Sequence, residues 1–387
     1  MSQSSLSVVW LVVASVCAVL VIVSAPFIGQ LRTAIRAAFP GEFVTIVAGG
    51  VTVVIAAAIG YALFRIRERR MFRYALIASA LIVGTVYAIA TSSGRPDLDA
   101  VECVHFVEYG LITLLFYRAW RPLGDASVLV LPILAGLAMG TVEEWFQWFI
   151  PRRIGELRDV FLNTVAIGCG LLFSLGLDPP SRFTVALRPG SARHIGIAAA
   201  VVTMALALFL EVVHLGHEIG DPEIGSFRSL YSASELEAIT RERTERWTHD
   251  PPLVLPRLGR EDQYMTEGVQ HVQRRNTMWE AGDYDAAWRE NLILERYYPP
   301  VLDTPSFVSP TGHRWPPEQQ ADAAERFRAT AGTGAAFVSA AYPYEIYTWP
   351  RAIFWAIATA MACAALAAGV VVDRQADRGR PEDHDRS

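Results

Sequence analysis

The chain of 387 residues is too apolar for an ordinary soluble protein. Hydrophobic residues make up 52% of it and the mean hydropathy is +0.28. The apolar residues fall in long blocks, which is typical of membrane proteins. The formal net charge is −5 and all 34 basic residues are arginine. We attribute the absence of lysine to overall composition and take it as no sign of a binding surface.

The cysteine pattern excludes two classes of small-protein scaffold. Cys17, Cys103, Cys169 and Cys363 lie in or beside apolar blocks, and none falls between Leu215 and Pro350. We therefore expect neither a disulfide framework nor a zinc cluster. No cofactor is predicted.

Seven apolar blocks are long enough to cross about 30 Å of hydrocarbon. They run Leu6 to Phe27, Phe43 to Phe64, Phe72 to Ala90, Ala126 to Phe149, Val160 to Leu177, Ile195 to Leu215 and Ala352 to Val372. The first block has no basic residue before it and no convincing cleavage site after it, so we interpret it as a retained span.

An eighth block, Val101 to Trp120, contains three ionisable residues, and the distribution of arginines decides whether it spans. If it spans, one side of the membrane holds fourteen short-loop and tail arginines and the other side six; if it does not, the bias inverts to eight against twelve. The fourteen are Arg65, Arg67, Arg69, Arg70, Arg73, Arg118, Arg121, Arg182, Arg188, Arg193, Arg374, Arg378, Arg380 and Arg386, and the six are Arg32, Arg36, Arg95, Arg152, Arg153 and Arg158. The positive-inside rule favours the spanning arrangement with both termini cytoplasmic.

The predicted fold class is therefore all-α, a polytopic membrane bundle of about eight spans with an inserted extracytoplasmic helical domain. Two N-terminal spans and a basic cytoplasmic loop (1–71) precede a four-span membrane domain (72–178). A cytoplasmic loop and the seventh span (179–215) lead to the extracytoplasmic domain (216–350), the last span (351–372) and a disordered cytoplasmic tail (373–387).

The extracytoplasmic segment is acidic and helical in pattern. It holds 21 acidic residues and 13 arginines, a net charge of 13 − 21 = −8, which would repel nucleic acid and anionic lipid. Helical periodicity and caps predict helices at Glu235 to Trp247, Glu261 to Glu280, Tyr284 to Tyr298 and Pro316 to Ala329.

Ionisable residues inside spans are costly and call for an explanation. In the fourth span, Glu102, His105 and Glu108 are three residues apart and share one helical face, with Tyr109 beside them. In the predicted topology they occupy the outer half of that span.

The next two spans bring polar residues to the same depth. Glu143 or Glu144 shares a face with Gln147, and the sixth span begins with Asp159 and places Asn163 one turn deeper. The loop between these spans carries Arg152, Arg153, Glu156 and Arg158. We expect a shared, water-accessible pocket at the outer face.

A simpler interpretation is that charged residues at helix ends meet lipid headgroups and water, with Asp159 serving a helix N-terminus. We prefer it for Glu102, Arg152, Glu156 and Arg158. The pocket is favoured for the deeper residues His105, Glu108, Glu144 and Gln147.

Three motifs in these spans resemble the signature of the VanZ-like family of membrane proteins. They are HFVEYG at 105–110, EEWFQ at 143–147 followed by PRR at 151–153, and DVFLN at 159–163. The resemblance covers Phe72 to Leu177, and the first two spans, the outer domain and the last span lie outside it.

Three positions depart from the family pattern. Glu143 stands where the family usually has Asp, Arg152 replaces a turn glycine, and Ala166 replaces a frequent Gly. The resemblance implies a role in the cell envelope, because the founding member is associated with low-level resistance to the glycopeptide antibiotic teicoplanin. It does not supply a reaction.

One hypothesis is a non-enzymatic envelope protein whose outer pocket binds a lipid-linked or amphipathic ligand, such as a lipid-linked cell-wall precursor. Its outer domain would modulate access or dock a protein partner. Arg153 would pair with a phosphate or carboxylate of the ligand. The expected ligand-binding residues are Tyr109, Gln147, Arg153, Asp159 and Asn163.

The alternative is an intramembrane hydrolase or transferase acting on a polyprenyl-phosphate or cell-wall precursor. His105 or Glu144 would be the general acid or base, Glu108 would orient His105, and water would attack, because the motifs offer no Ser or Cys nucleophile. Glu108, Glu144, Asp159 and His105 could instead hold a divalent cation, but no dedicated metal motif is present and no metal site is predicted.

Transport is the least favoured function, because the chain shows no inverted repeat and its polar residues gather at one face. Gly136 and Gly140 form a small-xxx-small pair that indicates close helix packing.

Overall fold

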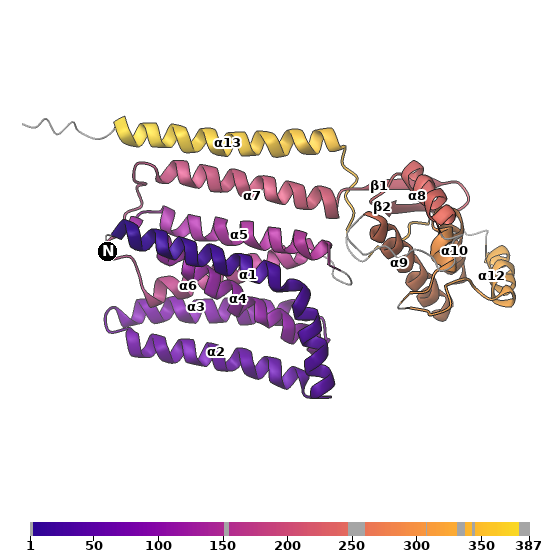
Figure 1. The fold of residues 1–387 in the computed structure, drawn as a ribbon, viewed down its shortest axis with the longest axis horizontal. Helices are drawn as coiled ribbons and strands as arrows, with labels where there is room; N and C mark the ends of the chain where they lie inside the picture. The colour runs from indigo at the N-terminus through magenta and orange to yellow at the C-terminus, as the bar shows by residue number, and fades with distance from the viewer. Residues whose placement is uncertain are drawn as a thin grey trace, which may run out of the picture. The chain divides into compact units, whose positions relative to one another are not determined.

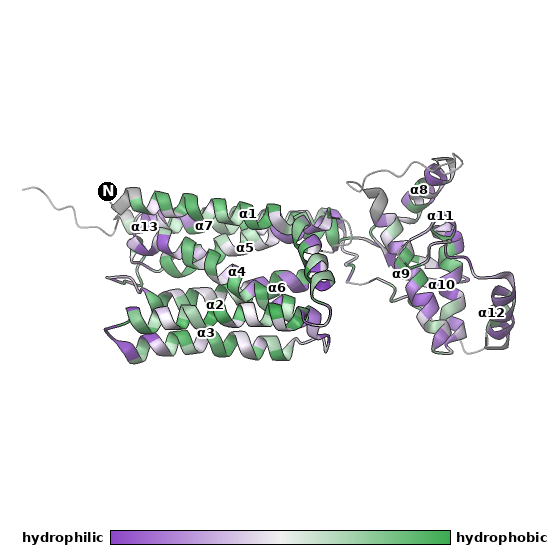
Figure 2. Cartoon of the chain, turned by 60° about the horizontal axis from the view of Figure 1, so that its bottom comes forward, coloured by the Kyte–Doolittle hydropathy of each residue, from purple (hydrophilic) through white to green (hydrophobic). Residues whose placement is uncertain are grey.

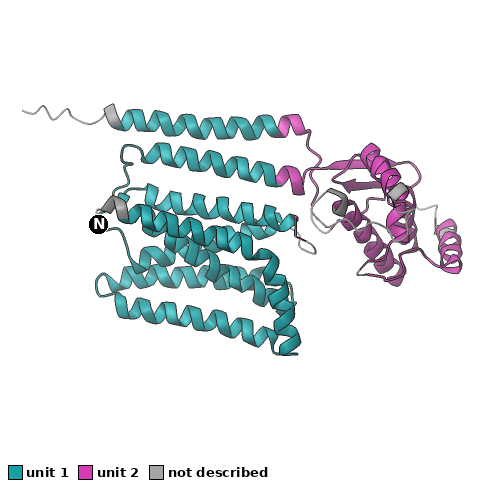
Figure 3. Cartoon of the chain, in the orientation of Figure 1, with its two compact units in different colours: residues 1–148, 154–209, 355–387 teal, residues 149–153, 210–354 magenta. Residues whose placement is uncertain are grey.

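The computed structural model describes residues 3–150, 155–246, 260–306, 308–330, 337–342 and 345–378. It divides into two compact units (Figure 3). Unit 1 comprises residues 1–148, 154–209 and 355–387, and unit 2 comprises residues 149–153 and 210–354.

In the part of the chain that the structure describes, eight long helices build unit 1, and all are long and apolar enough to span a membrane (Figure 1). They are α1 (Gln3–Ala38), α2 (Phe43–Arg65), α3 (Arg70–Ala90), α4 (Pro96–Trp120), α5 (Ser127–Trp148), α6 (Leu157–Leu177), α7 (Ser191–Val213) and α13 (Arg351–Arg378), with a short 3-10 turn, η1 (Arg121–Leu123), after α4. The predicted all-α membrane bundle is confirmed. The doubtful fourth span is α4, which begins at Pro96.

Hydrophobic residues predominate along these helices (Figure 2), and many large apolar side chains on them are exposed. Val53, Phe64 and Ile89 are 68%, 71% and 73% exposed. Contiguous apolar surface of this kind is unfavourable in water but suits contact with lipid chains. Because helices satisfy their own backbone hydrogen bonds, they can lie in hydrocarbon.

Two helices extend past their predicted spans. The first apolar block was expected to end at Phe27, but α1 continues through Pro26 to Ala38 and bends in its C-terminal part (Figure 1). Proline lacks an N–H and crowds the preceding turn, which explains the bend. The last helix, α13, runs to Arg378, so residues 373–378 of the segment expected to be a disordered tail are helical; residues 379–387 lie outside the described residues.

Helices α4, α5 and α6 form the tightly packed centre of unit 1. A Cβ at Gly170 of α6 would lie 2.8 Å from the Gly110 Cα of α4, and a Cβ at Gly136 of α5 would lie 3.0 Å from Ile167. Small residues let the helix backbones approach, which is how membrane helices gain packing energy without a hydrophobic driving force.

Polar side chains tie together the ends of the helices remote from the motif residues. Asp125, fully buried before α5, accepts hydrogen bonds from Ser127, from the Arg188 N–H at 2.7 Å and from the Ser191 hydroxyl at 2.7 Å. Its pKa lies below the usual range, because these hydrogen bonds outweigh the opposing effect of burial. Asp125 therefore connects the starts of α5 and α7.

Unit 2 contains the helices that the periodicity predicts. They are α8 (Ala233–Arg246), α9 (Arg260–Glu280), α10 (Tyr284–Tyr297) and α12 (Pro317–Thr330), together with a short α11 (Pro299–Asp303). Trp247, predicted as the end of the first helix, lies outside the described residues.

Unit 2 also has an antiparallel hairpin that the sequence did not reveal. Its strands are β1 (His217–Asp221) and β2 (Gly225–Ser229), with His217 opposite Ser229. The Asp221 carboxylate accepts the N–H groups of Glu223 and Ile224 and so closes the turn, and Gly225 has φ +111°, which favours glycine. The strands contain two glycines and few β-branched residues, so propensity gave little signal.

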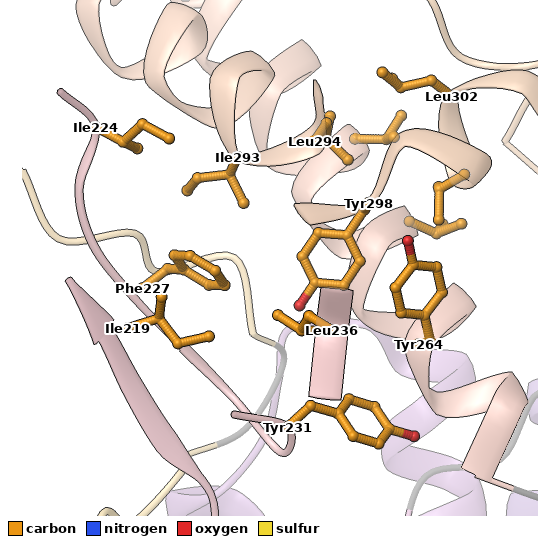
Figure 4. Packing of buried hydrophobic residues seen from close by; sticks show 13 residues of the cluster. Ile219, Ile224, Phe227, Tyr231, Leu236, Tyr264, Ile293, Leu294, Tyr298 and Leu302 are labelled. Carbon is orange, nitrogen blue, oxygen red and sulfur yellow. The ribbon is translucent and has the colours of Figure 1, made fainter. Parts of the chain in front are cut away.

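The core of unit 2 combines apolar packing with buried polar groups. The hairpin, α8, α9 and α10 enclose Phe227, Leu236, Tyr264, Ile293 and Tyr298 (Figure 4).

Beside this cluster the buried Glu267 carboxylate accepts hydrogen bonds from five groups: Ser229 Oγ, the Leu230 N–H, Gln263 Nε2, Tyr298 OH and Tyr342 OH. Burial and the neighbouring Glu267 carboxylate raise the pKa of Tyr298, so it remains a hydrogen-bond donor.

Candidate functional site

Five motif residues lie together in one buried network between α4, α5 and α6 of unit 1. They come from three helices: Tyr109 from α4, Glu143, Glu144 and Gln147 from α5, and Asn163 from α6. Each is at most 5% exposed. Helical spacing explains the α5 set, because residues three and four apart face the same side.

Tyr109 occupies the middle of this network. Its hydroxyl donates to the Glu143 carboxylate and accepts from Asn163 Nδ2 at 3.0 Å. The Gln147 amide donates to both carboxylates, at 3.2 Å to Glu143 and 3.3 Å to Glu144. The network thus links three consecutive spans through side-chain hydrogen bonds.

Two glycines make room for the network. A Cβ at Gly140 would lie 3.1 Å from the Tyr109 hydroxyl and 3.3 Å from Asn163 Cβ. A Cβ at Gly155 would lie 2.1 Å from the Glu144 carbonyl oxygen, and the neighbouring Glu156 N–H donates to the Glu144 carboxylate at 3.4 Å. The segment before α6 therefore packs directly on the end of α5.

The structure brings some of the predicted site residues into contact and leaves others apart from the network. Tyr109, Glu144, Gln147 and Asn163 meet in the network, and the His105 ring stacks on Tyr109 with centroids 6.1 Å apart. Glu108 of α4 and Asp159 in the first turn of α6 are half-buried. Arg153, the residue expected to meet an anionic ligand, lies outside the described residues, as do all of residues 151–154.

Glu143 takes part in the network although it was not among the predicted site residues. The sequence offered Glu143 and Glu144 as equivalent partners of Gln147, and only Glu144 was chosen as a site residue. In the structure Gln147 reaches both, and Tyr109 donates to Glu143. The spacing alone could not separate them, because i+3 and i+4 both fall on one face.

The rim of this region carries an ion pair. Arg158 of α6 donates to Glu102 of α4 at 2.7 Å, with the Arg158 side chain 49% exposed. Both residues were expected to lie at helix ends near water and headgroups. Within the described part of the chain, no group of three or more His, Cys, Asp or Glu side chains is placed to hold a metal ion.

A groove of about 750 Å³ runs along the other side of α4, bounded by α2, α3 and α6. Its walls are mainly apolar, including Phe106, Gly110 and Leu114. At one end it meets Ser92, Asp99 and Glu102, where the Ser92 hydroxyl donates to Asp99 at 2.6 Å. The groove therefore has an apolar body and one polar end, next to the Glu102–Arg158 pair.

Comparison with protein families identifies this region. Residues 43–177 match the family model described as VanZ/LLP1. The chain contains a VanZ-like domain. The match begins at the start of α2, so the VanZ-like domain includes one helix that the motif resemblance, which began at Phe72, had placed outside it. Searches of curated proteins and of solved structures found no match.

Proposed function

We propose that the VanZ-like domain binds a lipid-linked, amphipathic ligand, whose hydrocarbon chain occupies the groove along α4 and whose head group lies at its polar end. The observation that carries the proposal is the groove itself, with about 750 Å³ of space, apolar walls and a polar terminus. Ligand sites combine apolar walls with a few placed polar groups in this way.

The polar end offers contacts for a head group. The half-exposed Arg158 guanidinium beside Glu102 can donate to a phosphate or carboxylate, and the Ser92 and Asp99 side chains can bond hydroxyl groups. In the topology that the arginines predict, this end faces outward, where lipid-linked cell-wall precursors reside. His105, Glu108, Asp159 and Arg153 remain the predicted contacts at this level.

The buried network lies beside the groove and connects the helices that form its walls. Tyr109 and Asn163 link α4 and α6, and Gly110, next to Tyr109, lines the groove. Asn163 Oδ1 is buried and has no hydrogen-bond partner among the described residues. We assign the network the role of holding α4, α5 and α6 in the spacing that shapes the groove.

The family resemblance extends the proposal to drug resistance. A protein that sequesters or presents a lipid-linked precursor, or an amphipathic antibiotic, would reduce susceptibility to teicoplanin-type glycopeptides. Expression of the chain in a susceptible host should then raise the inhibitory concentration of teicoplanin, and a groove-filling variant should not.

Gly110→Leu provides that variant. A Cβ at Gly110 meets no atom within 4 Å, so a larger side chain enters the groove without a clash at Cβ. Gly168→Leu is the matched control, since its Cβ also meets nothing and it does not line the groove. The probe is undecaprenyl phosphate, added to full-length protein in phosphatidylcholine nanodiscs and measured by native mass spectrometry.

We expect Gly110→Leu to lower the bound probe by about tenfold, roughly the effect of losing one favourable contact worth 1.4 kcal/mol, and Gly168→Leu to retain it. Equal retention by wild type and Gly110→Leu would contradict the proposal. Conversion of the probe that disappears in His105→Ala would replace it with the hydrolase or transferase alternative.

A further inference from the structure

A second cavity, of about 390 Å³, lies at the opposite end of α4 from Glu102. The ends of α1, α2, α4 and α6 and the turn η1 enclose it. Its walls carry three arginines, one aspartate, one serine, two aromatic residues and three other apolar residues: Arg65, Arg118, Arg121, Asp178, Ser7, Trp10, Tyr61, Leu6, Pro122 and Leu177.

The formal charge of this cavity is positive. Three guanidinium groups against one carboxylate give 3 − 1 = +2. Arg121 is already engaged, because it pairs with Asp178 at 2.9 Å and donates from Nε to the Pro179 carbonyl oxygen at 3.2 Å. The excess charge therefore resides on Arg65 and Arg118.

The Arg118 side chain is positioned by an aromatic ring, and no carboxylate among the described residues neutralises its charge. Its guanidinium lies over the Trp10 ring, 5.0 Å from the centroid, and its Nε is buried without a hydrogen-bond partner in the described part of the chain. Among the described residues, neither Arg65 nor Arg118 pairs with a carboxylate. A buried guanidinium donor without an acceptor is unfavourable, and a bidentate oxyanion would satisfy it.

The lining favours an anion that carries hydrocarbon over a small soluble ion. Leu6 and Tyr61 are exposed on the surfaces of α1 and α2, where lipid chains would contact them, and Trp10, which lies against the Arg118 guanidinium, lines the same cavity. We propose that the cavity binds the phosphate of an anionic phospholipid, with Arg65 and Arg118 as the phosphate ligands. Basic pockets between spans on the cytoplasmic side bind acidic lipid head groups by this chemistry.

This site is separate from the groove. Glu102 and Arg118 are sixteen residues apart on α4, which corresponds to about 24 Å along the helix. In the topology predicted by the arginine distribution the cavity faces the cytoplasmic leaflet, whose anionic lipids supply the ligand. The inference does not depend on the groove, and failure of either leaves the other standing.

The test uses full-length protein in phosphatidylcholine nanodiscs with and without phosphatidylglycerol, and native mass spectrometry of the lipid that stays bound. The double variant Arg65→Gln/Arg118→Gln removes the two unpaired guanidinium groups. Arg67→Gln/Arg70→Gln is the matched control, since it makes the same charge change between α2 and the first residue of α3, and neither residue lines the cavity.

We expect wild type to retain phosphatidylglycerol in preference to phosphatidylcholine. The Arg65→Gln/Arg118→Gln variant should lose affinity for phosphatidylglycerol by about tenfold or more, as expected when two juxtamembrane charges are removed. The control variant should bind it as wild type does. Equal retention of the two lipids by wild type would overturn the proposal, and this comparison does not depend on the folding of any variant. Unchanged retention of phosphatidylglycerol by Arg65→Gln/Arg118→Gln would also overturn it. Inorganic phosphate is the second arm: if it alone raises thermal stability as much as phosphatidylglycerol does, the site is one for free phosphate and the lipid assignment fails.

Discussion

The two units of the chain both bury carboxylates, but they surround them differently. In unit 2, Glu267 receives five hydrogen bonds within a core of tyrosines and aliphatic residues, on helices with polar outer faces. In unit 1, Glu143 and Glu144 lie among helices whose outer faces are apolar, at crossings lined by glycine.

The difference follows from the solvent of each unit. In water, burial of apolar area stabilises unit 2, so its core tolerates polar groups once they are fully bonded. In lipid, apolar residues gain little by leaving the surface, so unit 1 depends on close backbone packing and a few interhelical hydrogen bonds. The same residue types therefore contribute different amounts to the stability of the two units.

The largest expected effect is in unit 2. Glu267→Ala leaves buried donors of Ser229, Leu230 and Tyr298 without an acceptor, and we expect it to destabilise unit 2 by at least about 3 kcal/mol. Thermal unfolding of the full chain in detergent, followed by limited proteolysis of unit 2, measures the change. Glu237→Ala is the control, because that side chain is 77% exposed beside Arg241 and should cost under about 0.5 kcal/mol.

In unit 1 the largest effect should come from packing. Gly170→Ala places a Cβ 2.8 Å from the Gly110 backbone, which must shift, at a cost of about 1–3 kcal/mol. Gly168→Ala lies on the same helix with no atom within 4 Å of its Cβ, and its better helix propensity should leave stability equal or higher. Equal melting temperatures of the two variants in detergent would refute the packing difference between the units.

Asp125 offers a pH-dependent contact in unit 1, in the short segment between α4 and α5. Since its folded-state pKa is lowered, the unfolded chain binds more protons, and the carboxylate stabilises the fold fully above its unfolded pKa of about 3.9. This contribution is lost as the pH falls through the folded pKa.

Asp125→Asn should therefore lower stability by about 1–2 kcal/mol at neutral pH, and the difference in stability from wild type should shrink as the pH falls through the lowered folded-state pKa of Asp125. Melting temperatures of both proteins across this range measure it. A gap independent of pH would show that the charge of Asp125 does not contribute.

The smallest expected effect concerns the buried network in lipid. Tyr109→Phe removes the hydroxyl between Glu143 and Asn163, yet interhelical hydrogen bonds in membranes average only about 0.6 kcal/mol, so we expect a loss of about 1 kcal/mol. Tyr61→Phe, on a side chain 51% exposed, is the control. A loss as large as that of Glu267→Ala would mean that the two units use buried hydrogen bonds alike.

The sequence by itself determined the long helices of this protein. Long apolar blocks specify the spans because a helix is the only open-chain structure that satisfies its backbone in hydrocarbon, and α4 could be recognised despite Glu102, His105 and Glu108. Helical periodicity specified α8, α9, α10 and α12 as well. The hairpin at 217–229 was not predicted because its residues have weak strand propensity. It is stabilised by the Asp221 side chain and by backbone hydrogen bonds of Ser226 with Phe337 and Ser339.

Only the tertiary structure decided what the polar residues do. Spacing placed Tyr109, Gln147 and Asn163 at one depth, but which hydroxyl donates to which carboxylate depends on how α4, α5 and α6 cross at Gly140 and Gly170. The groove and the arginine cavity lie between helices distant in the chain, such as α2 and α4. Counting arginines predicts on which side of the membrane they lie. Finding that Arg65 and Arg118 have no carboxylate partner among the described residues required the positions of neighbouring helices, because pairing is set by distance in space and not in sequence.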